Sequence, residues 1–355
     1  MLMEEKQPEL IWEAGTAYDL FISLLVLHDP DEYGLRASWA AGVRSRLPAN
    51  ERKVLEESVF ALGLPLPWIH RLPEPRDSAS VFYSLSQLPA DRRLKTLSGD
   101  HPEHTQIHEL LEEVSERGSF DQNDQETLWS LAHEKKHGFS AKDAARILEW
   151  WSHPAESGEQ YLRALQSYHQ VFFAEEEDRI LPALSSAQER AQELAQRLQV
   201  PDLVEELSQG VRFTSLLDVS KLVLAPSFWS TPIVFFEPFS QQGMIMTYGA
   251  RPATASLVPG EDVPDGLLRV LKAMADPTRL RIMQYLAEEP LTPAQLSRKL
   301  RLRAPTVVHH LHSLRMAGLV QLTLEEGGEK RYGLRRDMPA DTFADLEKFL
   351  KEGSG

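Results

Sequence analysis

A histidine–glutamate motif near the middle of the chain has the spacing of a zinc-dependent hydrolase. The sequence HEKKH at 133–137 places two histidines one helical turn apart with a glutamate between them, an arrangement that binds zinc and supplies a general base. Two adjacent lysines would repel the cation and resist burial, and Gly138 ends the helix at once. We keep a zinc-dependent hydrolase as an alternative hypothesis and predict that the chain is not an enzyme, with no catalytic residue and no cofactor.

A second set of histidines could hold a transition metal. His101, His104 and His108 lie on one face of an expected helix, with Glu112 one turn further, and several imidazoles on one face can bind zinc or nickel. The polar residues between them indicate a solvated surface instead. The chain has no cysteine, which removes thiolate ligands, thiol catalysis and disulfides. We therefore predict no metal site.

Basic and hydrogen-bonding residues near the C-terminal end could bind DNA. On a helix that begins at Pro305, several side chains opposite the apolar face can donate or accept hydrogen bonds at base edges, and a cluster of arginines precedes this helix, which a duplex backbone would favour. The predicted DNA-contacting residues are Arg279, Arg298, Arg301, Arg303, Thr306, His309, His310, His312, Ser313, Arg315, Lys330 and Arg331. His310 borders the apolar face, so a packing role is an equal alternative for it.

The distribution of charge along the chain favours the same hypothesis. The chain has a net charge of −15, yet residues 265–336 contain 13 Lys/Arg and 7 Asp/Glu. This segment therefore carries +6 and the remainder carries −21. Such segregation is typical of a DNA-binding module joined to a domain that DNA repels. The alternative hypothesis is an interaction module that contacts only other proteins.

Local signals predict three helices and a hairpin in the basic segment. Asp276 followed by Pro277 is typical of a helix start, and Thr292 with Gln295 can form a capping box. A third helix begins at Pro305 and is followed by the alternating stretch QLTLEEGGEKRYGL, which has two glycines at its centre and predicts a hairpin. This order of elements is typical of a winged helix-turn-helix.

The rest of the chain is predicted to be mainly α-helical. Apolar residues repeat at three and four residues from Trp12 to about Gln209, whereas KLVLAP, PIVFFEP and GMIMTYGAR predict two or three strands of a small antiparallel sheet. Several aromatic residues could line an effector pocket or simply build the core. The predicted domains are a helical domain at 1–210, a β-segment packed on it at 211–258, a linker at 259–264, a winged helix-turn-helix domain at 265–336 and a C-terminal helix at 337–352.

The basic segment closely resembles the arsenic-repressor (ArsR) type of winged helix regulator. The stretches LKAMADPTRLRIMQYL and LTPAQLSRKLRLRAPTVVHHLHSLRMAGLV, followed by a Gly-Gly hairpin, carry this resemblance over about residues 265–336. It implies a homodimeric regulator, here expected to be a repressor, that binds double-stranded operator DNA and responds to an inducer. It also implies a dimer interface between the first and last helices of the module, made here by Leu267, Leu268, Leu271, Phe343, Leu346, Phe349 and Leu350.

The long N-terminal region also resembles the larger members of this family, and we expect it to sense a small-molecule effector of unidentified chemistry. The segment departs from the family pattern at Arg303, Ala304 and Val308, where members often have serine, glutamine and serine, so we expect poor capping by Ala304 and different base preferences. Metal-sensing members use cysteines or an Asp/His set on the last helix, and the last helix here has no histidine. No apolar stretch approaches the roughly 20 residues of a membrane-spanning helix and no secretory signal is visible, so we expect a cytoplasmic protein with no membrane partner.

Overall fold

The chain is mostly helical, with two small sheets. A computed structural model describes residues 7–31, 33, 35, 37–99, 105–134, 140–213, 219–252, 255, 263–325 and 329–352. The N-terminal helices are α1 (Thr16–His28), α2 (Ala37–Arg46), α3 (Ala49–Leu62), α4 (Leu66–His70), α5 (Ser78–Gln87), α6 (Ala90–Ser98), α7 (Thr105–Arg117), α8 (Gln122–Glu134), α9 (Ala141–Ser152), α10 (Pro154–Tyr168), a π-helical turn (His169–Phe173), α11 (Ala174–Ala195) and α12 (Val200–Leu207). None of the helices in the described ranges combines the length and apolar character needed to cross a membrane.

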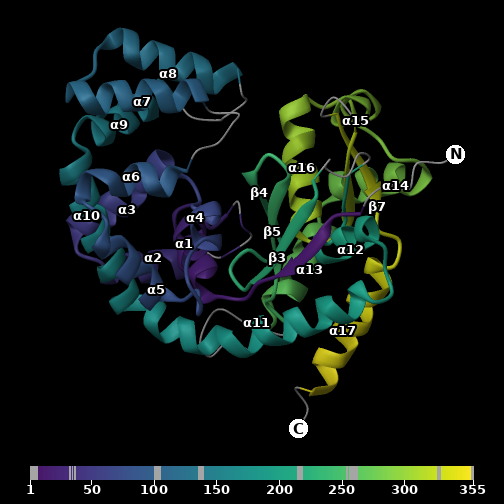
Figure 1. Ribbon diagram of the computed structural model, residues 1–355. Helices are drawn as coiled ribbons and strands as arrows, with labels where there is room; N and C mark the ends of the chain where they lie inside the picture. Colours follow the sequence, from purple (N-terminus) through teal and green to yellow (C-terminus); the bar gives the residue numbers. More distant parts are fainter. Residues whose placement is uncertain are drawn as a thin grey trace, which may run out of the picture.

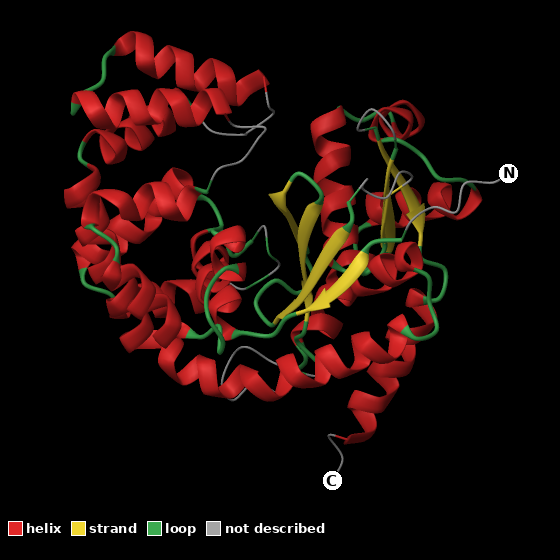
Figure 2. Cartoon of the chain, in the orientation of Figure 1, coloured by secondary structure: helices red, strands yellow, loops and turns green. Residues whose placement is uncertain are grey.

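These helices form an arc around the larger sheet (Figures 1 and 2). The long helix α11 runs beneath the sheet from the arc to α12 and contains Pro182 in its interior. A single cluster of buried side chains joins the helices to the sheet, and its largest fully buried members are Trp229, Tyr18, Tyr168, Tyr248 and Phe173. The arc and the sheet therefore share one hydrophobic core.

The larger sheet is mixed rather than antiparallel, so the predicted antiparallel sheet was wrong. Its strands are β1 (Glu9–Trp12), β3 (Lys221–Ser227), β4 (Phe235–Ser240) and β5 (Gly243–Gly249), in the order β1-β3-β5-β4. The β1–β3 and β3–β5 pairs are parallel, and only β4 and β5 are antiparallel. Six of the seven residues of β3 are buried, which is the pattern of a parallel strand that is covered on both faces.

The C-terminal segment forms a second unit with its own core. Its elements are α13 (Asp265–Met274), α14 (Pro277–Glu288), α15 (Pro293–Leu300), α16 (Ala304–Met316), the antiparallel strands β6 (Val320–Leu324) and β7 (Lys330–Leu334), and α17 (Met338–Glu352). A separate cluster of buried side chains, which includes Ile282, Leu296, Leu311 and Leu322, fills the space between them. The predicted tip glycines 327–328 and most of the predicted linker at 259–264 lie outside the described residues.

A short strand from the N-terminal region joins the sheet of the C-terminal unit. Strand β2 (Val211–Phe213) pairs in parallel with β6, so the second sheet has the order β2-β6-β7. The backbone N–H of Leu322 also donates to the carbonyl of Gly210 at 2.7 Å. Residues 211–213 were expected to belong to the β-segment packed on the helical domain; the strand does contact α12 of that domain, and its pairing with β6 adds a connection that was not expected. Backbone hydrogen bonds thus connect the two units directly.

Candidate DNA-contacting surface

The turn between α15 and α16 exposes a group of arginines. Helix α15 begins with the expected capping box, in which Thr292 accepts from the backbone of Gln295 and Gln295 accepts from that of Thr292. The helix ends at Leu300, and its C-cap Arg301 has a left-handed backbone with φ of 58°. This conformation is costly for a residue with a side chain and is usual for glycine at a helix C-terminus. An arginine at this place therefore projects its charge from a sharp turn.

The arginines of this turn are exposed and have no acidic partner. Arg298, Arg301 and Arg303 are all exposed, and none of the three forms an ion pair with any residue that the structure describes. Neighbouring Lys299 differs, because its ammonium group lies 3.5 Å from Glu289 and 5.3 Å from the ring centroid of Tyr285. Three unneutralised guanidinium groups thus lie directly before α16.

The first turns of α16 present polar and apolar side chains to solvent. Val307, Leu311 and Leu314 are fully buried and form the inner, apolar face. Thr306 and His309 are exposed, and Val308 is 48% exposed. The helix begins one residue earlier than expected, at Ala304, and its N-cap Arg303 provides no side-chain hydrogen bond. Ala304 is therefore the first helical residue rather than the cap.

The second half of α16 is more enclosed. Met316 is buried. The Ser313 hydroxyl donates to the carbonyl of His309 at 3.1 Å, and His312 is half-buried. Burial lowers the pKa of Arg315, and nearby Tyr332 opposes this shift. The exposed residues of α16 therefore lie in its N-terminal half.

His310 packs against the cap of the preceding helix. Its ring nitrogen Nδ1 lies 4.0 Å from Asp276, and its side chain is 15% exposed. Burial lowers the pKa of His310, which the charge of Asp276 opposes, so the imidazole is neutral near pH 7. Asp276 itself accepts from the backbone N–H of Arg279 as the expected N-cap of α14, which lowers the pKa of its carboxyl group. The geometry favours the packing alternative for His310.

Arg279 is engaged within the module rather than on the exposed surface. Its guanidinium donates to the carbonyl oxygens of Ala273 at 2.7 Å and Lys272 at 2.9 Å. These are carbonyls of the last turn of α13, which lack intrahelical donors. Arg279 therefore caps α13 and fixes its position relative to α14.

The two basic residues of the β6–β7 hairpin have different surroundings. Lys330 is exposed. The guanidinium of Arg331 lies 2.8 Å from Glu325 and 3.5 Å from Glu329, and it also donates to the carbonyl of Pro290. Two carboxylates already neutralise Arg331, so it would have to exchange them to bind a phosphate.

The residues predicted to form a dimer interface lie on two helices in contact, α13 and α17. Phe343 and Leu350 on α17 are 60% and 62% exposed, and they lie seven residues apart, on one face of the helix. Leu267 is already buried within the chain. The remaining four, Leu268, Leu271, Leu346 and Phe349, are half-buried.

The described residues give less support to the two alternatives, a zinc-dependent hydrolase and a histidine metal site. Lys135, Lys136 and His137 of the HEKKH motif, and His101 and His104 of the second histidine set, lie outside those residues. His133 stacks on Trp129 with ring centroids 5.3 Å apart. Among the residues that the structure describes, no group of three or more His, Asp or Glu side chains could hold a metal ion.

A serine, a histidine and a glutamate also meet in the N-terminal region. The Ser78 hydroxyl lies 3.0 Å from His169 Nε2 and donates to Glu177 at 2.5 Å. In a hydrolase triad the carboxylate binds the far nitrogen of the imidazole and not the nucleophile. Ser78 is also buried, and Glu177 accepts from its backbone N–H. This cluster holds the first turn of α5 against α11.

A family model matches part of the C-terminal unit. The family model described as "Bacterial regulatory protein, arsR family" matches residues 276–321. The "HTH-type transcriptional regulator CmtR" of Mycobacterium tuberculosis and of Mycobacterium bovis is 44% identical over 80 residues, which are 22% of this chain and 67% of that protein. No solved structure matches the chain. The matched segment contains the turn and helix described above.

Proposed function

This chain belongs to the arsR family of bacterial regulatory proteins and is a DNA-binding transcriptional regulator, and from this premise we propose that it represses transcription by binding a specific operator through the α15–α16 surface. We define this surface by Arg298, Arg301, Arg303, Thr306 and His309. The observation that carries the proposal is the exposure of its three arginines without an acidic partner among the described residues. A duplex backbone binds such unneutralised groups with release of counterions.

Helix α16 is the element that we place in the major groove. In winged helix-turn-helix proteins the second helix of the motif reads base edges with its N-terminal residues. Thr306 and His309 can exchange hydrogen bonds with bases, and exposed Val308 suits contact with a thymine methyl group. The arginines of the preceding turn are then placed at the flanking phosphates.

The β6–β7 hairpin acts as the wing and contacts phosphate mainly through Lys330. This assignment rests on the exposure of Lys330 and on the pairing of Arg331 with Glu325 and Glu329. A paired guanidinium contributes less to binding, because its ion pairs must be lost when it meets a phosphate. Binding of Lys330 to a phosphate does not require the loss of these ion pairs.

We propose that the regulator is a homodimer joined through α13 and α17. Phe343 and Leu350 form an exposed apolar pair on α17, and exposed large hydrophobic side chains on one helix face are typical of interfaces. A two-fold axis through these helices would place two copies of α16 in successive major grooves. Replacing both residues by glutamate should give a monomer in sedimentation equilibrium; a persistent dimer would contradict this interface.

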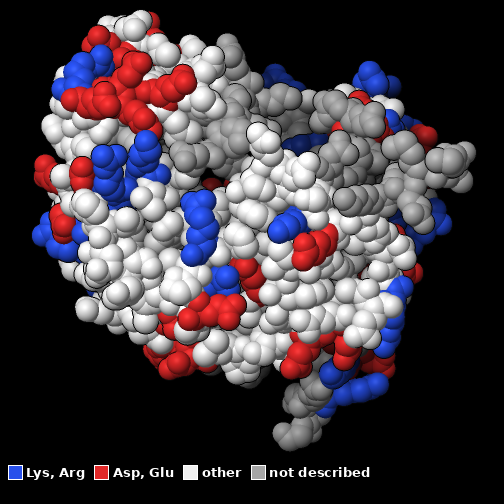
Figure 3. Space-filling view, viewed as in Figure 1, with Lys and Arg blue, Asp and Glu red and all other residues white. Residues whose placement is uncertain are grey.

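The N-terminal region is proposed to act as the sensor, through its direct connection to the wing. Strand β2 is hydrogen-bonded to β6, so a displacement of the N-terminal region would move the wing sheet. In the view of Figure 3, acidic side chains gather over α7 and α8, far from the α15–α16 surface. This region would repel DNA and orient the molecule with its basic side toward the duplex.

The proposed function can be tested by selection of bound sequences from random duplex DNA with the full chain. We expect enrichment of a near-palindromic site whose affinity falls steeply with salt. Replacing Arg303 by alanine should weaken binding and reduce the salt dependence. The matched control is Lys53→Ala, which removes an exposed charge from α3. Failure to enrich any sequence, or equal effects of the two substitutions, would contradict the proposal.

A further inference from the structure

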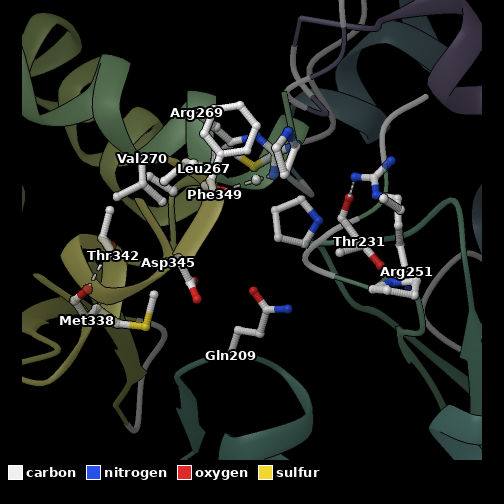
Figure 4. Close-up of a pocket in the computed structure, with 18 of the residues that line it drawn as sticks. Gln209, Thr231, Arg251, Leu267, Arg269, Val270, Met338, Thr342, Asp345 and Phe349 are labelled. Atoms are coloured by element: carbon white, nitrogen blue, oxygen red, sulfur yellow. Dashed lines mark hydrogen bonds between the residues drawn. The ribbon is translucent and has the colours of Figure 1, made fainter. Parts of the chain in front are cut away.

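A cavity of about 330 Å³ lies between the two units of the molecule. Figure 4 shows its labelled lining residues around an open space, with Thr231 and Arg251 of the N-terminal unit on one side and residues of α13 and α17 on the other. Gln209, just before β2, closes a third side. A volume of this size accommodates a small organic molecule.

The N-terminal wall of the cavity contributes a half-buried arginine, Arg251. Arg251 donates through Nη2 to the carbonyl of Thr231 at 2.7 Å, while its Nη1 is buried and lacks a hydrogen-bond partner among the described residues. Burial, together with the charge of Arg269, lowers the pKa of Arg251 to about 9, although the charge of Asp265 opposes this shift. The adjoining turn is held in place by Asp19, whose carboxylate accepts from the backbone N–H of Trp229.

Arg269 on α13 contributes a second guanidinium. Its Nη1 donates to the carbonyl of Met316 at 3.3 Å, and its Nε is buried without a hydrogen-bond partner in the described parts of the chain. A buried donor left unpaired destabilises the protein until a ligand or another group accepts from it. The carboxylates whose charge acts on Arg251 are Asp265, at the start of α13, and Asp19, and Asp345 also lies on the lining of the cavity. Two incompletely satisfied arginines line one small cavity.

The rest of the lining is largely apolar. Leu267 and Val270 of α13, Met316 of α16, and Met338 and Phe349 near the two ends of α17 all line the cavity. A free inorganic anion would leave these side chains without a partner. A ligand with an apolar body and one negatively charged head group would contact both parts of the lining.

We propose that this cavity binds a small organic acid, with its carboxylate between Arg251 and Arg269 and its apolar body against α13 and α17. The effect of this ligand on DNA binding rests on the proposed function, because α13 and α17 are the helices that we assign to the dimer interface. A ligand that changes the separation of these two helices changes the spacing of the two copies of α16, and so the affinity for the operator. The cavity is then the effector site of the regulator.

Methionine methyl groups offer a direct test. The chain has 8 methionines, of which Met316 and Met338 line the cavity while Met246 and Met283 are buried elsewhere. We expect hexanoate or 4-phenylbutyrate, added to the full chain with ¹³C-labelled methionine methyl groups, to shift the Met316 and Met338 signals saturably below about 5 mM. Hexanol and 4-phenylbutanol should shift them at least about tenfold more weakly, because they lack the charge.

Two arginine variants separate binding from folding. Arg269→Met and Arg251→Met should each weaken carboxylate binding about tenfold or more, with the Met246 and Met283 signals unchanged as evidence of an intact fold. The absence of a saturable shift with either acid, equal shifts with the alcohols, or insensitivity to both variants would overturn the proposal.

Operator affinity is measured separately, with and without the acid. Normal operator binding without acid binding would contradict the effector site alone, whereas acid binding without operator binding would contradict the proposed function alone. Binding of both without mutual influence would remove the regulatory role of the cavity.

Discussion

Two groups of arginines in the C-terminal unit differ in what their guanidinium groups contact. Those of the α15–α16 turn are exposed and have no acidic partner among the described residues. Arg279 and Arg331, in contrast, are bound by carbonyl oxygens or carboxylates of the chain itself. Sequence alone gives all of them the same charge. The difference indicates which arginines are available for a phosphate and which maintain the architecture of the module.

The largest effect is expected from removing the whole free group. The triple variant Arg298→Ala, Arg301→Gly, Arg303→Ala should lower operator affinity by about 10²–10³-fold and make the salt slope less negative by about 2.5–3. Glycine is chosen at 301 because it favours the left-handed backbone found there. Electrophoretic retardation at several salt concentrations measures both quantities. A slope equal to that of the unmodified chain would show that these groups do not contact phosphate.

Removing a bound arginine should instead reduce stability. Arg279→Ala deletes two charged hydrogen bonds to the end of α13 and should lower the free energy of unfolding by about 2 kcal/mol. Its neighbour Arg281 is exposed, so Arg281→Ala should change this free energy by less than about 0.5 kcal/mol. Urea unfolding followed by circular dichroism compares the two. Equal stabilities would contradict the capping role.

His309 should affect specificity more than affinity. His309→Ala should reduce discrimination at one base pair by about 1–2 kcal/mol, because its exposed ring lies on the part of α16 assigned to the groove. Arg303→Ala should weaken binding to all sequences equally. Sequencing of selected duplexes for the two variants provides the comparison. Identical changes in sequence preference would refute this division of roles.

The smallest effect is expected at Arg331. Because Glu325 and Glu329 already neutralise its guanidinium, Arg331→Ala should change operator affinity by less than about threefold. Glu325→Gln should strengthen binding slightly, since it frees part of this charge. A loss of operator affinity larger than that caused by Arg303→Ala would show that Arg331 contacts phosphate, as we expect of the arginines of the α15–α16 turn.

Local signals predicted the elements of the C-terminal unit well. The caps at Asp276 and Thr292 depend on residues three positions apart, so short sequence windows contain them. The N-terminal half of α16 was likewise predictable from its apolar spacing. The groups that each arginine contacts could not be predicted, because the partners of Arg331 and Arg279 depend on how the chain folds back on itself.

Long-range pairing explains what sequence analysis missed. Strand β1 pairs with a strand that lies more than 200 residues further along the chain, and β2 pairs with β6 of the other unit. Short strands of this kind carry weak local signals, although the continuous burial of β3 matches a parallel strand. The cavity could not be predicted from the sequence for the same reason, since Arg251 and Arg269 belong to different units.

A cleavage experiment tests the role of the α15–α16 surface most directly. The chain has no cysteine, so Thr306→Cys gives a single attachment point for an iron chelate that cuts nearby DNA. Glu116→Cys, exposed on α7, is the matched control. We expect the iron chelate at position 306 to cut within the selected operator and the chelate at position 116 to cut nowhere in it. Cleavage from position 116, or none from position 306 despite retained binding, would contradict it.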